Sequence, residues 1–141
     1  MKSGRPLLIP TATPITVLPA TIAIAWKGTQ EAARAVTASM PLLSMAKQII
    51  IMTVAEDESR SEQEGTSRLM TCLRWHGFPI AMRRLVPIAD NPAETLLAAA
   101  REEAGLLVMG GYGHSRLREW IFGGFTQRVL REAEVPVFIS H

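Results

Sequence analysis

The stretch MGGYGHSRLREWIFGGFT, Met109–Thr126, decides how this sequence is interpreted. Two glycine pairs, Gly110–Gly111 and Gly123–Gly124, bracket a basic segment, and Gly113 follows the first pair closely. Because glycine has no Cβ, it lets the backbone approach another group closely or turn sharply. The stretch begins at the end of the apolar run LLVMG, Leu106–Gly110, which is typical of a buried strand. The glycines therefore indicate either a ligand loop or two tight turns at a strand end.

Outward from this stretch, apolar strand-like runs alternate with helical patterns along the chain. Near-continuous apolar strands separated by helices predict a parallel sheet covered on both faces. We therefore expect an α/β fold, a doubly wound three-layer α/β/α sandwich around a five-stranded parallel sheet. In such folds, ligands bind beyond the carboxyl ends of the strands, where the strand order switches. The expected strands are 21–26, 48–55, 78–88, 106–110 and 135–140.

Several residues mark the expected helix ends. Thr29 is suited to cap the helix that follows the first strand, and Gly77 to end the second helix. In the segment NPAE, Asn91 is the expected N-cap, Pro92 the first helical residue and Glu94 the capping-box acid. A last helix is expected over about 125–134.

Composition indicates a single compact domain and narrows the function classes. The chain has 141 residues, of which 48% are hydrophobic and 20% charged, and its formal net charge is +2. Its arginines are scattered among acids and form no concentrated basic stripe, so we expect no nucleic-acid partner. Four prolines interrupt the uncharged run Pro6–Trp26, so we expect neither a signal peptide nor a membrane span.

Cys72 is the only cysteine, which excludes an intrachain disulfide and a thiolate metal site. We interpret it as a buried, inert thiol in a helix. The three histidines lack metal-ligand spacing, so no metal ligands are predicted. A reducing, cytoplasmic location suits this composition.

The first 20 residues do not fit the alternation of strands and helices. RPLLIP, Arg5–Pro10, is strand-like and is followed by a Pro/Thr-rich linker with no helix. We therefore divide the chain into an N-terminal extension, 1–20, with a possible edge strand at 5–9, and an α/β domain, 21–141. The alternative for the extension is an unstructured tail.

By physical chemistry alone, the glycine segment is a weak motif. Glycine turns and the start of the last helix could direct backbone N–H groups at a phosphate, with His114 nearby. The segment contains neither a Walker loop nor G-x-G-x-x-G. Ser115 directly follows His114, an order that does not suggest a catalytic triad, so no catalytic residues are predicted.

The whole pattern resembles the universal stress protein family. Nucleotide-binding members carry G-x2-G-x9-G-[S/T] after the fourth strand, and Gly110, Gly113 and Gly123 reproduce that spacing. AWKGTQEAARAV, NPAETLLAAAREEAGLLVMG and VPVFIS also look like family segments, so the resemblance covers about Thr21–Ser140. It implies a fold of the adenine nucleotide alpha hydrolase type.

The sequence departs from the family pattern in both parts of the implied site, the part that binds phosphate and the part that binds adenosine. Gly124 occupies the [S/T] position, and Lys27 stands where binders carry an acid that contacts the adenosine portion. Gly105 replaces a common Asp, whereas Val54 and Thr126 are retained. The nucleotide-binding residues that the resemblance implies are Ala25, Trp26, Lys27, Val54, Met109, Gly110, Gly113, His114, Gly123, Gly124, Phe125 and Thr126.

The resemblance implies a stress-response regulatory protein that binds ATP or another adenine nucleotide, with Mg, and does not turn it over efficiently. No positioned base or metal-holding acid stands in the motif, so we expect no dedicated enzyme. The alternative is a nucleotide-free interaction module. A hydrolase of the related superfamily is disfavoured because AWKGTQ lacks an SGGxDS-type loop.

The resemblance also implies a partner. Family dimers commonly join through their last strands, so we expect a homodimer through edge strands. SGRPLLIP resembles the end of a preceding domain, which makes this chain similar to the second domain of a tandem universal stress protein. Another universal stress protein domain is therefore a further candidate partner.

Overall fold

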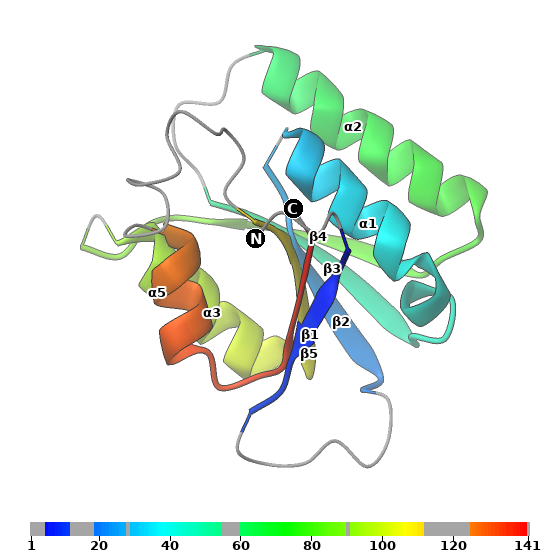
Figure 1. The fold of residues 1–141 in the computed structure, drawn as a ribbon. Coiled ribbons are helices and arrows are strands. Elements are labelled where there is room, and N and C mark those ends of the chain that lie inside the picture. The colour runs from blue at the N-terminus through cyan, green and yellow to red at the C-terminus, as the bar shows by residue number, and fades with distance from the viewer. Residues whose placement is uncertain are drawn as a thin grey trace.

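A computed structural model describes residues 5–11, 19–27, 29–54, 60–89, 91–111 and 125–140. Within them, six strands form one sheet in the order β1-β6-β5-β2-β3-β4 (Figure 1). All neighbouring strands are parallel except β1 and β6, which are antiparallel. The strands are β1 (Leu7–Ile9), β2 (Thr21–Ala25), β3 (Gln48–Val54), β4 (Ile80–Leu85), β5 (Leu106–Gly110) and β6 (Val137–Ser140).

The five parallel strands predicted for 21–141 are present, and β1, at the possible edge strand 5–9, adds a sixth that is antiparallel, so the sheet as a whole is mixed and not fully parallel. Leu7 pairs with Ile139 and Ile9 with Val137, in antiparallel register. The five predicted strands were counted from their alternation with helices, and β1 has no helix after it. An antiparallel strand needs no crossover helix, so the alternation of strands and helices gave neither the direction of β1 nor its pairing with β6.

Helices cover both faces of the sheet, as the doubly wound prediction requires. Figure 1 shows α1 and α2 on one side, and α3 and α5 on the other. Each helix connects two parallel strands, which gives the three-layer architecture. The helices are α1 (Gln30–Leu43), α2 (Arg60–Trp75), α3 (Pro92–Glu103) and α5 (Phe125–Glu132).

The predicted caps Thr29, Asn91 and Gly77 are confirmed, whereas the Asn91 N–H donates to the Ile88 carbonyl at 3.0 Å and not to Glu94, the predicted capping-box acid. The Thr29 hydroxyl accepts the Ala32 N–H at 3.2 Å, and the Asn91 side-chain oxygen accepts the Glu94 N–H at 3.2 Å. Gly77 follows α2 with a φ of 77°, the left-handed conformation that glycine adopts without strain. Helix α5 ends at Glu132, two residues before the expected end at 134.

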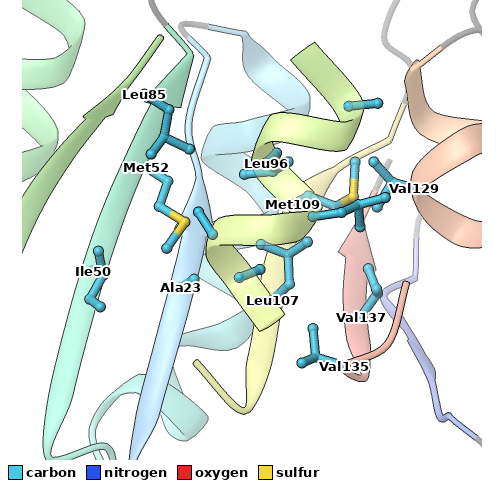
Figure 2. Packing of buried hydrophobic residues seen from close by; sticks show 14 of the residues in the cluster. Ala23, Ile50, Met52, Leu85, Leu96, Leu107, Met109, Val129, Val135 and Val137 are labelled. Atoms are coloured by element: carbon cyan, nitrogen blue, oxygen red, sulfur yellow. The ribbon is translucent and has the colours of Figure 1, made fainter. Parts of the chain in front are cut away.

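The sheet separates two hydrophobic clusters, because its central strands are buried on both faces. One cluster lies under α3 and α5 and includes Met52, Leu96 and Met109 (Figure 2). The other lies under α1 and α2 and includes Ile51 and Leu73. Alternate residues of each strand thus belong to opposite layers.

Cys72 is exposed, which corrects the prediction of a buried thiol. In α2 its neighbours Leu69 and Leu73 are buried against the sheet. Cys72 lies three residues after Leu69, and this helical spacing alone predicts that the two side chains share a face. The buried face of α2 is therefore narrower than helical spacing alone predicts, and it does not include Cys72.

Gly105 lies where the N-terminal linker returns to the sheet. A Cβ built on Gly105 would lie 2.6 Å from the Cβ of Pro19, and the Gly105 N–H donates to the Thr21 carbonyl at 3.0 Å. Because an aspartate carries a Cβ, it would meet the same obstacle. The absence of the family's Asp at this position thus has a structural reason.

We expect Gly105→Ala to lower the free energy of unfolding by about 1–3 kcal/mol, because the added methyl group overpacks the contact with Pro19. Urea unfolding followed by circular dichroism measures this loss. In a Pro19→Gly background, which removes the opposing Cβ, the same substitution should cost much less. Equal losses in both backgrounds would show that Pro19 is not the obstacle.

Candidate functional site

The candidate site lies at the carboxyl ends of β2 and β5, where the strand order reverses. After β2 the chain forms β3 and β4, which lie on one side of β2 within the sheet, whereas β5 and β6 lie on the other side of β2. Ala25, the last residue of β2, pairs with Met109 of β5. The connections that leave two such strands run in opposite directions, and the crevice between them is the usual ligand position in doubly wound folds. The glycine stretch therefore starts at the expected position.

Gly110 has a defined structural role at this point. A Cβ built on it would lie 2.5 Å from both the Ala32 nitrogen and the Glu31 carbonyl carbon of α1. Both are backbone atoms of the first helical turn and cannot move aside as a flexible side chain would. The close approach that this glycine permits is therefore to helix α1.

The next glycine uses its backbone N–H within the sheet. Gly111 donates to the Ser140 carbonyl at 2.7 Å, just beyond the pairing of Gly110 with Ser140. This amide continues the ladder between β5 and β6. It already has an acceptor in this structure and is therefore not available to a phosphate.

Three predicted residues lie on one face of the sheet, although they come from three strands. Met109 belongs to the hydrophobic cluster under α3 and α5, and Ala25 and Val54 pack against that cluster. They come from the carboxyl ends of β5, β2 and β3. The structure thus brings these residues together as an apolar group on that face.

Trp26 and Lys27 do not join that group. The Trp26 side chain packs against the cluster under α1 and α2, and the Trp26 backbone N–H donates to the Met52 carbonyl at 2.9 Å. Lys27 is exposed, and its carbonyl accepts the Thr29 N–H at 2.6 Å. Lys27 therefore turns the chain into α1 and presents its side chain to solvent at the edge of the sheet.

The remaining predicted residues lie in or before α5. Helix α5 begins at Phe125, and Thr126 in its first turn is 4% exposed. A hydroxyl buried in the first turn of a helix is placed to serve the helix end or the core, not open solvent. Gly113, His114, Gly123 and Gly124 lie outside the described residues.

Some residues at this edge were not predicted from the sequence. Glu31 and Ala32 contact Gly110 through backbone atoms, and the Ser140 carbonyl accepts a glycine amide. Thr53 is only 4% exposed, although it is polar. Apart from Thr53 and the first residue, Gln48, all residues of β3 are apolar. Only Thr53 leaves a signal in the sequence, as a hydroxyl in the apolar run IIIMTV.

Within the described ranges, no group of three or more His, Cys, Asp or Glu side chains could hold a metal ion. No described helix is long and apolar enough to cross a membrane.

The model of the universal stress protein family matches residues 33–141 of this chain. The match covers most of the sequence, so the chain belongs to the universal stress protein family. The resemblance inferred from the glycine spacing is confirmed at this level.

Known relatives agree with this assignment. A universal stress protein from Synechocystis sp. is 37% identical over 62 residues, which cover 43% of this chain and 21% of that protein. A universal stress protein from Archaeoglobus fulgidus DSM 4304 superimposes with a TM-score of 0.75 at 22% identity, over 98% of this chain and 50% of that one. This chain thus spans about half the length of the Archaeoglobus protein.

Two single-domain-sized structures show the same fold. A family member from Burkholderia pseudomallei matches with a TM-score of 0.59 and 27% identity, over 89% of this chain and 98% of that one. A universal stress protein solved in complex with cAMP matches with a TM-score of 0.66 and 21% identity, also over 89% and 98%. The likeness to a second domain of a tandem protein stays a prediction.

We expect Gly110→Ala to destabilise the protein by at least about 1–3 kcal/mol, because its methyl group would push the first turn of α1 off β5. The urea midpoint of the purified protein measures this effect. Gly65→Ala is the matched control, since a Cβ on Gly65 of α2 meets nothing within 4 Å. That control should gain about 0.5–1 kcal/mol, because alanine stabilises a helix interior relative to glycine. A neutral Gly110→Ala would contradict the packing role.

Proposed function

We propose that this protein binds an adenine nucleotide at the carboxyl ends of β2, β3 and β5 and acts as a regulatory member of its family in the stress response. The observation that carries the proposal is the position of the glycine motif, which begins at the switch point between β2 and β5. A structurally similar family member is known in complex with cAMP. The single cysteine and the family suggest a cytoplasmic location.

The apolar group formed by Ala25, Val54 and Met109 supports the position of the base. Adenine is flat and largely apolar on its faces, so it needs apolar contacts with few polar ones. Ala25 and Val54 are half-buried at the strand ends, where they are accessible to a ligand above the sheet. The phosphates would then reach the glycine motif and the first turn of α5, whose amides favour negative charge.

Lys27 shapes which part of the nucleotide is recognised most strongly. An ammonium group is a donor with no acceptor, so it cannot receive hydrogen bonds from ribose hydroxyls. It attracts phosphate oxygens instead. Its exposed position at the end of β2 is consistent with a flexible cation that reaches toward phosphates. We therefore propose that affinity rises with the number of phosphates.

We further propose that the bound nucleotide is not turned over efficiently. Phosphoryl transfer requires a positioned nucleophile and neutralisation of charge, commonly by protein-held metal ions. The motif offers glycine amides and cations, and Glu119 is the single acid in its sequence, so the motif itself supplies no pair of acids to hold Mg. Mg would enter with ATP and remain coordinated mainly by phosphates and water.

We expect isothermal titration calorimetry of the nucleotide-free protein to give micromolar affinity for ATP with Mg, and weaker affinity for AMP and cAMP. Lys27→Gln should weaken ATP binding about 3- to 30-fold, because it removes one partly screened charge interaction worth about 0.7–2 kcal/mol. The affinity for AMP should fall by a smaller factor in the same variant.

Gly113→Val tests the motif directly, since a side chain there would hinder close approach of phosphate to the backbone. ATP binding should be abolished, whereas Gly65→Ala should bind like the unaltered protein. Absence of heat with every nucleotide, in a protein shown to be folded, would contradict the proposal.

A second candidate function is an interaction module that pairs through its sheet edge, and the exposed side chains of β1 favour it. Leu7 is 42% exposed and Leu8 52% exposed, on an edge strand with only one neighbour among the described strands. Unpaired edge strands with apolar side chains are templates for pairing with another chain. We therefore propose a homodimer through β1, in which a second copy of this chain pairs with the edge strand; another universal stress protein domain is the alternative partner.

We expect sedimentation equilibrium to give about twice the chain mass of 15.5 kDa. Leu8→Lys should shift the protein toward monomer, because it places a charge at the pairing edge. Val86→Lys is the control, since Val86 is 73% exposed and follows β4 at the opposite edge of the sheet. A mass of one chain at every concentration, or equal effects of both substitutions, would exclude a dimer through β1.

A further inference from the structure

Two buried polar atoms near the carboxyl edge of the sheet have no hydrogen-bond partner in the part of the chain that the structure describes. They are Nε1 of Trp26 and Oγ1 of Thr53. Buried polar atoms in folded proteins are nearly always satisfied by protein groups, ordered water or ligands. Two such atoms on neighbouring strands therefore require an explanation.

The register places these residues side by side. Ala25 pairs with Met52, and the backbone N–H of Trp26 donates to the Met52 carbonyl at 2.9 Å. One residue further along each chain, Trp26 therefore lies beside Thr53. Neighbouring parallel strands lie about 4.8 Å apart, so the two side chains start from adjacent backbone positions.

Both side chains also belong to the same face of the sheet. Trp26 packs against the cluster under α1 and α2. Ile49 and Ile51 of β3 belong to this cluster, and Thr53 is the next residue in their alternation. Ala25 and Val54 instead pack on the α3 and α5 face. The Trp26–Thr53 pair is thus separate from the proposed contacts of the adenine base.

The two atoms have complementary requirements. The indole N–H of Trp26 only donates, whereas the Thr53 hydroxyl both donates and accepts. One oxygen atom with free lone pairs satisfies both by accepting the indole hydrogen and forming a hydrogen bond with the hydroxyl. We propose that Trp26 and Thr53 form an enclosed site for a single oxygen ligand on the α1 and α2 face.

Two sources can supply that oxygen, a bound water molecule or one oxygen of a small anion such as phosphate. Trp26 lies at the end of its strand and is only half-buried, so movement of the indole ring can admit either one. The site does not depend on nucleotide binding, because the residues proposed to contact adenine face the other way.

The sign of a stability change tests the site. Thr53→Val removes the hydroxyl at nearly constant volume. If the hydroxyl had no ligand, its removal would leave the urea midpoint unchanged or raise it, since an unsatisfied buried group would disappear. We expect the midpoint to fall, and to fall less in a Trp26→Phe background, where the indole donor is already absent. Thr53→Ser, which keeps the hydroxyl, should retain more of the coupling to Trp26.

Nitrogen-15 labelling of the tryptophans identifies the ligand. The chain has three tryptophans, and the Trp26→Phe variant assigns the indole resonance of Trp26. A long-lived water gives that N–H a cross-peak to water, which Thr53→Val should abolish. An anion instead shifts the resonance when inorganic phosphate is added, again only with Thr53 present.

Thr66→Val serves as the control for both measurements. It also removes a hydroxyl, one that donates to the Glu62 carbonyl within α2 at 3.0 Å. The Trp26 resonance should keep its response in this variant. An unchanged or raised midpoint in Thr53→Val overturns the proposal. Absence of both a water cross-peak and a phosphate shift in the unaltered protein overturns it as well.

Discussion

The contact between Gly110 and the first turn of α1 is the constraint on which this edge of the molecule depends. With 2.5 Å between a hypothetical Cβ and two backbone atoms, only glycine allows the helix to start directly against the end of β5. That contact fixes where α1 begins relative to the switch point between β2 and β5. The chain leaving β2 through Trp26 and Lys27 must therefore turn within a few residues, and Thr29 caps the helix at once.

Burial of the sheet on both faces has a second consequence, since adjacent residues at a strand end serve different layers. Ala25 and Val54 pack under α3 and α5, whereas Trp26 packs under α1 and Thr53 follows the same alternation. One edge of the sheet can therefore carry two independent sites only a residue apart in sequence. Apolar contacts suit a base on one face, and unpaired polar atoms suit a small oxygen ligand on the other.

The N-terminal segment adds a different kind of constraint. Strand β1 pairs with the edge of β6, and Pro19 packs against Gly105 at the amino end of β5. The chain before β2 is thus tied to the sheet at two points. This arrangement leaves the outer side of β1, with Leu7 and Leu8, as the exposed sheet edge next to β6.

The sequence by itself determined the α/β class, the five parallel strands and the capping residues, because these depend on local patterns of burial and hydrogen bonding. The whole sequence pattern, with the spacing of Gly110, Gly113 and Gly123, indicated the family that the family model matches. Only the tertiary structure decided that β1 is antiparallel, that Cys72 is exposed and that Trp26 lies beside Thr53. Those features depend on strand register and on the width of a buried helix face, which arise from contacts between residues distant in sequence.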